Sequence, residues 1–557
     1  MTLDEIDNGR EIYRGWSAPS VPSIGWLLGV LVVGICVTAG LLSVGMGPDN
    51  NWDLRYYHLY APWAYLHGRY LYDIAPAESQ SFFNPTADLL FYSLVSSRLN
   101  ESPRLIAFIM GAVHGLNAAL ILGIAYHVIR PRHHGERSVL RAAAIVMGAS
   151  GAGVISLLGT TTNDLLNSIF VLAALLCLLR INGRVGGRQW PSFAWPGALL
   201  GVAVGLKYTA AIFAPGLGLV ALCIAVRGKL LGGLIVFVGA SALAFLLVAG
   251  HHLATLWHSF GNPVFPLFNN IFDSPYFAAV FMQDNRFVAH DLGQLIGYPF
   301  YWMKTNVYVV SELPLRDWRG AIAYLATAAG LLLRFANLLR RVPPRPHMLA
   351  ETQGLGLLAA FVAVSYVAWA AAFGIYRYAV ALEMLTGVLT MASLIYLCRP
   401  RLLRVGAALV VLTVVMATTI RPDWGHGEHP SAGIRPAAYA ERYVDVHVPP
   451  LPPHSLVLIA TEAPVAYFIP FAEPTARYLG IDNSFLKLSQ RNELVREIRR
   501  LMRTEGTAKF ILGVDDPDGE TLNDLLGKFG MQRSTAPCQR IRSNLEEHAL
   551  SLCRLVP

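Results

Sequence analysis

Long apolar runs recur along the first three quarters of the chain, and short polar or charged segments separate them. A helix that spans a membrane needs about 20 mostly apolar residues, and eleven runs come close to this length. The runs cover residues 24–46, 103–129, 142–159, 164–180, 192–207, 209–226, 230–254, 319–338, 353–373, 378–398 and 403–420. The pattern predicts a mainly α-helical membrane bundle of about eleven spans over residues 1–420.

Three stretches between or after these runs are too long to be simple turns: 47–102, 255–317 and 421–557. Within the second of them, the aromatic segment 296–310 would break the alternation of the loops if it crossed the membrane. We therefore expect segment 296–310 to lie in the interface or to re-enter. The first two stretches are predicted to form outer loops with interfacial helices.

The tail, residues 421–557, changes in composition, because charged residues return and short apolar runs alternate with the charged stretch Gln490–Arg503. This pattern predicts a small α/β domain outside the membrane. Its only cysteines are Cys538 and Cys553. A disulfide between them is expected in an oxidising compartment, and two free thiols are the alternative.

Composition excludes several classes of protein. Hydrophobic residues make up 54% of the chain and charged residues only 14%, against roughly 25% charged in soluble domains, so neither a soluble enzyme nor a disordered chain fits. The chain carries a net charge of +8, and many of its arginines lie in short loops between apolar runs. Such loops face the cytoplasm, which indicates membrane topology and not nucleic-acid binding. The loops in question are 130–141, 180–188, 227–229, 334–345 and 399–404.

With these five loops inside, the N-terminus is expected in the cytoplasm and the tail on the outer side of the membrane. Directly after the first span, Asp53 opens an aromatic segment within the first outer loop. A carboxylate in a partly desolvated cleft is able to take a proton from a hydroxyl nucleophile. The alternative is that Asp53 only caps the helix that follows it.

The segment from Asn51-Trp52-Asp53 to Tyr72, followed by Phe83-Asn84-Pro85, resembles the GT-C superfamily of membrane glycosyltransferases. In particular, it is similar to the GT87-type mannosyltransferases that depend on polyprenol-phosphate-mannose. The resemblance implies a GT-C-like fold, a polyprenyl-phosphate-linked sugar donor and Asp53 as the catalytic base. Some GT-C members carry two acidic residues here, whereas only Asp49 accompanies Asp53, so no cofactor is expected and a divalent metal stays open.

Two basic residues interrupt apolar sequence on the expected outer side. Lys207 stands between the runs 192–207 and 209–226, and Arg377 precedes the run 378–398. Cations at membrane depth are costly and mark functional sites, so both are expected to hold the donor phosphate, with snorkelling to the surface as the alternative. Residues expected to contact the sugar or the acceptor are Trp52, Arg55, Tyr56, His58, Asn84, Tyr208 and Tyr376.

The other polar residues that stand out are expected to have structural roles. His251, His252 and His258 match no zinc signature, so no metal site is expected there. Asp164 is expected to cap a helix. A charged cluster before the span 319–338 is expected to form structural ion pairs; it comprises Glu312, Arg316, Asp317 and Arg319.

The sequence thus predicts a glycosyltransferase of the cell envelope that transfers a sugar, with inversion, from a polyprenyl-phosphate donor to a hydroxyl of a lipid, glycan or protein. No nucleotide site is expected, since the chain has no Gly-rich phosphate loop of the Walker type. The alternative is a transporter or flippase of lipid-linked saccharides. The long outer loops favour the enzyme.

Overall fold

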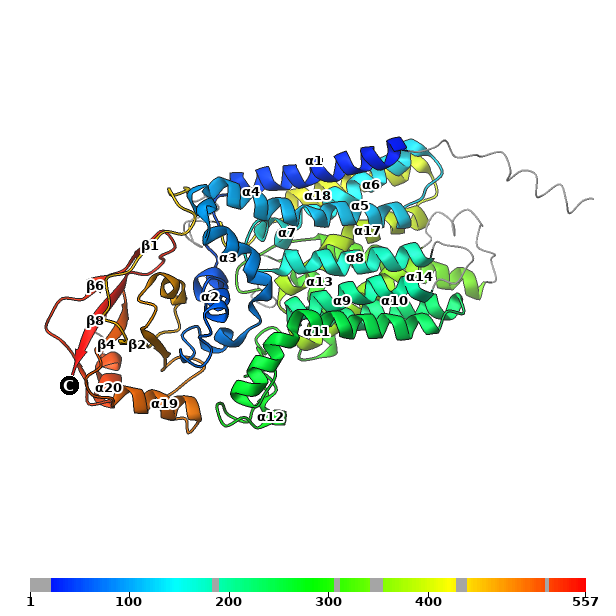
Figure 1. Ribbon diagram of the computed structural model, residues 1–557. Coiled ribbons are helices and arrows are strands. Elements are labelled where there is room, and N and C mark those ends of the chain that lie inside the picture. Colours follow the sequence, from blue (N-terminus) through cyan, green and yellow to red (C-terminus); the bar gives the residue numbers. More distant parts are fainter. Residues whose placement is uncertain (1–21, 183–189, 305–310, 341–353, 427–437, 516–519) are drawn as a thin grey trace, which may run out of the picture.

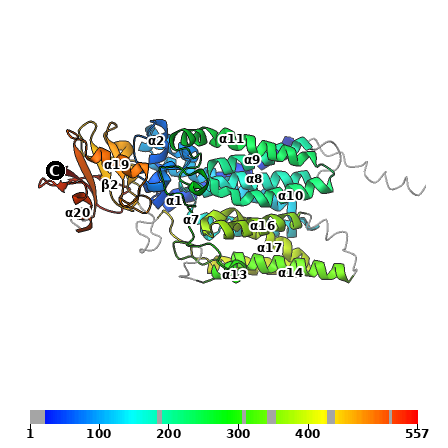
Figure 2. The ribbon, with the colours of Figure 1, turned by 90° about the horizontal axis from the view of Figure 1, so that it is seen from below.

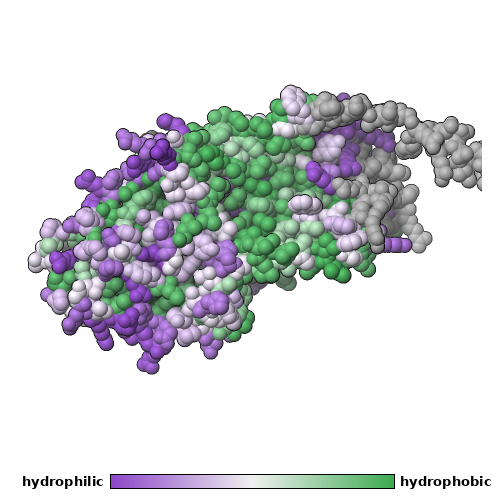
Figure 3. All heavy atoms as spheres, viewed as in Figure 1, coloured by the Kyte–Doolittle hydropathy of each residue, from purple (hydrophilic) through white to green (hydrophobic). Residues whose placement is uncertain are grey.

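The computed structural model describes residues 22–182, 190–304, 311–340, 354–426, 438–515 and 520–557. Figure 1 shows long helices packed side by side along one axis, with the tail at one end of the bundle. On the face that Figure 3 shows, the middle of the bundle is apolar, and polar surface lies toward its two ends. This distribution is that of a protein that crosses a membrane.

Within the described residues, nine helical stretches are long and apolar enough to span a membrane. The chain is therefore a multi-pass membrane protein, as predicted, but with fewer long spans than eleven. The bundle helices are α1 (Pro22–Met46), α4 (Pro103–His114), α5 (Leu116–Val128), α6 (His134–Ala149), α7 (Ala152–Ser156), α8 (Asp164–Asn182), α9 (Ala194–Leu206), α10 (Ala214–Arg227), α11 (Gly232–Phe260), α14 (Arg319–Leu339), α16 (Leu355–Ala372), α17 (Val380–Leu397) and α18 (Arg401–Thr418).

The shortfall has a physical reason in two of the eleven runs. The run 142–159 is divided between α6 and the five-residue α7, and α6 begins with the charged residues of the preceding loop. The run 192–207 forms a shorter apolar helix, Trp190–Leu206, below the length of the other spans. Both runs are helical and belong to the bundle, so the prediction was wrong in length and not in kind.

The helix α17 is the centre of the bundle. Nearly nine tenths of its apolar stretch is buried within the protein, whereas α1 and α18 are mostly uncovered. In Figure 2, α11 and α14 lie at opposite sides of the bundle, with α8, α9, α10, α16 and α17 between them. A helix that is apolar all round is stable only when other apolar surface surrounds it, which fits the central place of α17.

The arginine-rich turns lie at the end of the bundle away from the tail (Figure 1). There Arg404 of the turn 399–404 contacts Glu136 of the turn 130–141, with Nε and Oε1 2.8 Å apart. Residues 183–188 and 341–345 of the other expected loops lie outside the described residues. The alternation on which the topology was predicted is thus visible for the described turns.

The first outer loop folds into short helices that cover the end of the bundle. They are the π-helix η4 (Leu54–His58), α2 (Tyr60–Leu66), η5 (Glu78–Phe82), η6 (Pro85–Asp88), α3 (Leu89–Val95) and η7 (Arg98–Glu101). In the second outer loop, α12 (Asn269–Phe272) and α13 (Leu292–Tyr301) are both too short to cross a membrane. The part of the segment 296–310 from residue 305 onward lies outside the described residues.

The tail contains the predicted α/β fold. Its main sheet has the order β3-β2-β4-β8-β5, in which β2 is parallel to β3 and β4 and antiparallel β8 follows β4. Its elements are β1 (Val446–His447), β2 (Leu456–Ile459), η11 (Ala466–Phe471), β3 (Arg477–Gly480), α19 (Glu493–Met502), β4 (Lys509–Val514), α20 (Glu520–Gly527), β5 (Gln532–Arg533), β6 (Gln539–Arg540), β7 (Arg542–Ser543) and β8 (Leu550–Val556). A disulfide joins Cys538 to Cys553, which confirms that prediction.

The sheet of the tail is covered on one face by α19 and α20 and on the other by the first outer loop. Leu54 and Tyr57 of η4 share an apolar core with Val457 of β2 and Tyr478 of β3. The backbone of Ile74 also extends the sheet, since its N–H donates to Tyr478 at 2.9 Å. Figure 1 shows α2 and α3 between the bundle and this sheet. The outer loop is therefore held between the two parts of the protein.

Candidate active site

Asp53 lies where the chain enters η4, close to the end of α1. Its side chain makes no capping hydrogen bond, so the alternative that Asp53 only caps the helix is wrong. Its Oδ2 instead accepts a hydrogen bond from a terminal nitrogen of Arg377 at 2.5 Å, across 324 positions of sequence. Arg377 lies in η10 (Tyr376–Ala379), the turn before α17. The outer loop and the central helix thus meet through this ion pair.

The charges around Asp53 keep it ionised. Burial alone would raise the pKa of its carboxyl, but the charges of Arg377 and His58 and the hydrogen bond from Arg377 outweigh burial and lower that pKa below its ordinary value. A carboxylate next to a guanidinium favours its charged form. At neutral pH the cluster therefore contains an anionic Asp53.

Lys207, at the end of α9, forms the second ion pair. Its Nζ donates to Asp164 Oδ1 at 2.7 Å and to the carbonyl of Thr162 at 2.8 Å. The Tyr378 ring lies close to both cations, 5.1 Å from Lys207 Nζ and 5.4 Å from Arg377 Cζ. The side chains of Lys207 and Arg377 are only 16% and 18% exposed, so neither snorkels to the surface.

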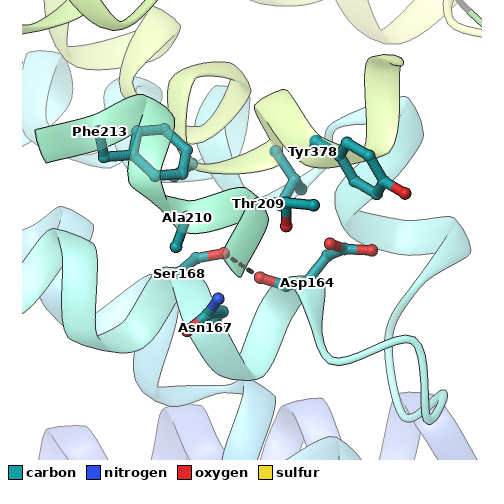
Figure 4. A pocket seen from close by; sticks show the side chains of 9 residues that line it. Asp164, Asn167, Ser168, Thr209, Ala210, Phe213 and Tyr378 are labelled. Carbon is teal, nitrogen blue, oxygen red and sulfur yellow. Dashed lines mark hydrogen bonds between the residues drawn. The ribbon is translucent and has the colours of Figure 1, made fainter. Parts of the chain in front are cut away.

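A small pocket lies beside this ring, between α8, η9 (Tyr208–Phe213) and the start of α17. Figure 4 shows Asp164 of α8 and Tyr378 on facing walls, with Thr209 between them. Several buried polar atoms at or near the pocket have no hydrogen-bond partner among the described residues: Asp164 Oδ2, Asn167 Oδ1, Tyr208 Oη and Arg377 Nε. Buried polar groups are normally bonded, so these atoms are available to a ligand.

A histidine–aspartate pair adds to the cluster. His58 Nδ1 lies 2.6 Å from Asp88 Oδ1, and the same oxygen accepts a hydrogen bond from the amide of Asn163 at 2.5 Å. With Nδ1 donating to Asp88, Nε2 of His58 remains as a donor when the ring is charged and as an acceptor when it is neutral. Nε2 is buried and has no partner among the described residues. His58 is thus fixed in orientation with one ring nitrogen free.

Some residues expected to contact sugar point elsewhere. Arg55 forms an ion pair with Glu547 of the tail. The amide of Asn84 donates to the carbonyl of Gly205 at 2.7 Å, while its oxygen caps η6. The hydroxyl of Tyr376 donates to Glu383 at 2.8 Å, on the side of its turn away from Asp53. These three side chains position neighbouring segments and do not join the cluster.

Trp52, Tyr56 and Tyr208 were also expected to contact the sugar or the acceptor. Trp52 is 48% exposed and its ring lies 6.2 Å from that of Tyr56, whose hydroxyl bonds to Glu78. Tyr208 follows Lys207 directly, and its hydroxyl is one of the unpartnered atoms described above. The Tyr208 ring lies 6.4 Å from that of Phe245 in α11. Of the residues predicted from sequence, the structure brings together Asp53, Lys207, Arg377 and His58.

The expected cap Asp164 is instead the partner of Lys207, and sequence reasoning missed this role together with Asp88 and Tyr378. Over the residues that the structure describes, no group of three or more His, Cys, Asp or Glu side chains is placed to hold a metal ion. His252 is buried and lies within hydrogen-bond distance of the carbonyl of Phe82. Arg319 and Asp317 form a buried ion pair, as predicted.

Comparison with known proteins adds two findings. Residues 84–360 match the family model described as Glycosyltransferase family 87; Lys207 lies within the match, and Asp53 and Arg377 lie outside it. No curated protein matches the chain. Among solved structures, an oligosaccharyltransferase of Archaeoglobus fulgidus, tethered with an acceptor peptide containing the NVT sequon, is similar over 88% of this chain and 70% of its own, with 12% identity and a TM-score of 0.42.

Proposed function

We propose that this chain, whose residues 84–360 match the model of Glycosyltransferase family 87, transfers a sugar from a polyprenyl-phosphate donor to a hydroxyl acceptor, with inversion. The observation that carries the proposal is the cluster of Asp53, Arg377 and Lys207 around the Tyr378 ring. It combines a carboxylate for the acceptor with two cations for a lipid phosphate. The family match speaks against the alternative of a transporter.

In the proposed step, Asp53 takes the proton of the acceptor hydroxyl, and the oxygen of that hydroxyl bonds to the anomeric carbon of the sugar. The bond between that carbon and the phosphate oxygen breaks, and polyprenyl phosphate leaves. Arg377 and Lys207 stabilise the negative charge that develops on the phosphate. Preorganised cations act strongly here because the side chains are largely removed from water.

The donor phosphate would also change Asp53. Arg377 is bound to Asp53, and a phosphate between Arg377 and Lys207 would compete for the same guanidinium. A carboxylate that loses a cationic neighbour becomes a stronger base. Donor binding would therefore activate Asp53, and the enzyme would not deprotonate an acceptor before the donor has bound.

We place this reaction on the outer face of a bacterial inner membrane, with the arginine-rich turns in the cytoplasm. His58 and Tyr208 are the residues we assign to contacts with the sugar or the acceptor, because each has a buried polar atom with no partner among the described residues. By resemblance, polyprenyl-phosphate mannose is the first donor to test. Neither a cofactor nor a nucleotide sugar is needed for the step.

The test is sugar transfer by the purified full-length protein in lipid nanodiscs. Polyprenyl-phosphate mannose and a nucleotide-linked mannose are offered separately with a panel of hydroxyl acceptors, and glycosylated product is measured by mass spectrometry. We expect product from the polyprenyl donor alone, and none with the Asp53→Asn protein. Transfer from the nucleotide donor, or equal transfer by the Asp53→Asn protein, would contradict the proposal.

A further inference from the structure

A second candidate binding site lies on the tail, away from the membrane bundle. It is a groove of about 300 Å³ between the end of α19 and the end of α20, and we call it the α19–α20 groove. Its lining residues are Leu488, Ser489, Arg499, Arg503, Lys528 and Phe529. The volume falls at the lower end of the range of small-molecule sites.

The lining of this groove carries charge of one sign only. Three of its residues are cationic and none is acidic, although the tail as a whole has nearly equal numbers of basic and acidic residues. Figure 3 shows a hydrophilic patch over this part of the tail, where Figure 1 places α19 and α20. Cations gathered in a concave surface raise the local concentration of anions.

The cations of the groove differ in how they are held. The guanidinium of Arg499 donates to the carbonyl of Leu488, which fixes it against the loop that forms one wall. Arg503 is exposed and has no side-chain partner among the described residues. Lys528 forms an exposed ion pair with Asp524 at 2.7 Å. Arg499 is therefore preorganised, and Arg503 is free to bind.

Compensation of a helix dipole does not account for this arrangement. Basic side chains in the last turn of a helix stabilise it by facing its own carbonyls. Arg500, in the last turn of α19, is occupied by Glu497 at 2.7 Å. Arg499 turns instead to the loop carbonyl of Leu488, and Arg503 lies beyond the helix. Their convergence on the groove needs another explanation.

We infer that the α19–α20 groove binds the negatively charged unit of an anionic saccharide, and so holds an acidic glycan acceptor on the tail. Guanidinium groups bind carboxylates and phosphates through paired N–H donors. Leu488 and the Phe529 ring offer an apolar wall for the C–H face of a sugar, and Ser489 offers a hydroxyl. The anion specificity rests on the groove alone, while the saccharide rests also on the proposed function.

The experiment measures binding by isothermal titration calorimetry with the full-length protein in nanodiscs of uncharged lipid. The probes are a disaccharide that contains glucuronate, its uncharged glucose counterpart and inorganic phosphate. We expect the charged disaccharide to bind, the uncharged one not to bind, and phosphate to bind more weakly. Arg503→Met and Arg499→Met should each weaken binding by about tenfold or more, because each removes a hydrogen bond to a charged group.

Arg496→Met is the matched control, since Arg496 lies on α19 but pairs with Glu493 outside the groove. Equal binding by Arg503→Met and by Arg496→Met would overturn the inference, as would equal affinity for both disaccharides. Phosphate binding as tight as that of the charged disaccharide would overturn the saccharide assignment. Asp53→Asn should leave this binding unchanged while it abolishes transfer, so failure of the groove and failure of the proposed function are told apart.

Discussion

The pairs Arg69–Asp73 and Arg377–Asp53, both at the end of the bundle that faces the tail, differ in how completely they are bonded. Asp73, between the outer loop and the tail, accepts from Arg69 at 2.6 and 2.8 Å, from the Tyr60 hydroxyl at 3.1 Å and from the backbone of Tyr478 at 3.1 Å. Arg69 also donates to two carbonyls of the segment before β3. The bonds to Tyr478, Pro474 and Ala476 join the outer loop to the tail, and those between Arg69, Tyr60 and Asp73 lie within the outer loop.

The pair of Asp53 and Arg377 is bonded sparsely. Arg377 contributes one hydrogen bond to Asp53, and its Nε has no partner among the described residues. The neighbouring pair is similar, since Asp164 bonds Lys207 through Oδ1 and leaves Oδ2 unpartnered. Both pairs cross between elements, but neither is saturated.

The different number of hydrogen bonds indicates a different role for each kind of pair. A buried charge is tolerated when hydrogen bonds satisfy it, and breaking such a pair destabilises a protein by about 3–5 kcal/mol. Polar atoms that are buried and unsatisfied require an explanation, and a ligand is one. The pair of Arg69 and Asp73 therefore stabilises the contact between outer loop and tail, while the sparse pairs are suited to exchange partners with a substrate.

Replacing each aspartate by asparagine tests this comparison most strongly. Asp53→Asn removes the proton acceptor, so turnover should fall by about 10²- to 10⁴-fold with little change in thermal stability. Asp73→Asn should change turnover little. It should lower the free energy of unfolding by about 3 kcal/mol, because it leaves Arg69 buried without its counter-charge. Initial transfer rates and thermal unfolding of both purified proteins give the two readouts.

The wild-type protein and Asp88→Asn complete this set. Asp88→Asn keeps the shape of the partner of His58 but removes its charge, and should lower turnover less than Asp53→Asn. If Asp53→Asn protein were as active as wild type, or if it unfolded at a temperature as low as the Asp73→Asn protein, the distinction between the two pairs would be wrong.

Much of this fold could be predicted from the sequence, because the pattern that specifies each membrane helix lies within that helix. A run of about 20 apolar residues specifies a membrane helix without reference to any partner, and all eleven expected runs are helical. Asp53 and the cations Lys207 and Arg377 were also found from sequence, since each stands alone at the edge of an apolar run. A single charged residue in apolar sequence is the feature by which each of them could be recognised.

The rest depends on contacts between distant segments. Asp53 meets Arg377 across 324 positions and Lys207 meets Asp164 across 43, and nothing in either segment specifies that pairing. The sequence gives no sign that the tail covers the first outer loop. Arg55 was expected at the sugar or the acceptor, yet in the structure it forms an ion pair with Glu547 of the tail.

Removal of one cation should have a smaller effect than removal of the base. Lys207→Met deletes a charged contact to the donor phosphate worth roughly 1.5–3 kcal/mol, so kcat/KM for the donor should fall by about 10- to 100-fold. Because Asp164 then lacks a counter-charge, Lys207→Arg is the informative companion and should recover part of the loss. Transfer rates over a range of donor concentration measure both.

Arg98→Met provides the control for this prediction, as Arg98 is an exposed cation of the first outer loop, outside the cluster. It should behave as wild type, which separates loss of a specific contact from loss of general positive charge. A Lys207→Met protein with unchanged kcat/KM would remove Lys207 from the donor site and leave Arg377 as the phosphate ligand.

The smallest expected effect concerns pH and the stability that the Asp53–Arg377 pair contributes. The pKa of Asp53 in the folded protein is lowered, so its contribution is fully present above the unfolded pKa of about 4 and is lost only as the pH falls toward the folded value. The difference in thermal stability between wild type and Asp53→Asn should therefore stay constant from pH 8 to pH 5 and shrink below about pH 4. Thermal unfolding of both proteins at half-unit steps of pH measures it. A difference that already changes between pH 8 and pH 5 would mean that the pKa of Asp53 lies above its ordinary value, and that Arg377 does not hold Asp53 in its ionised form.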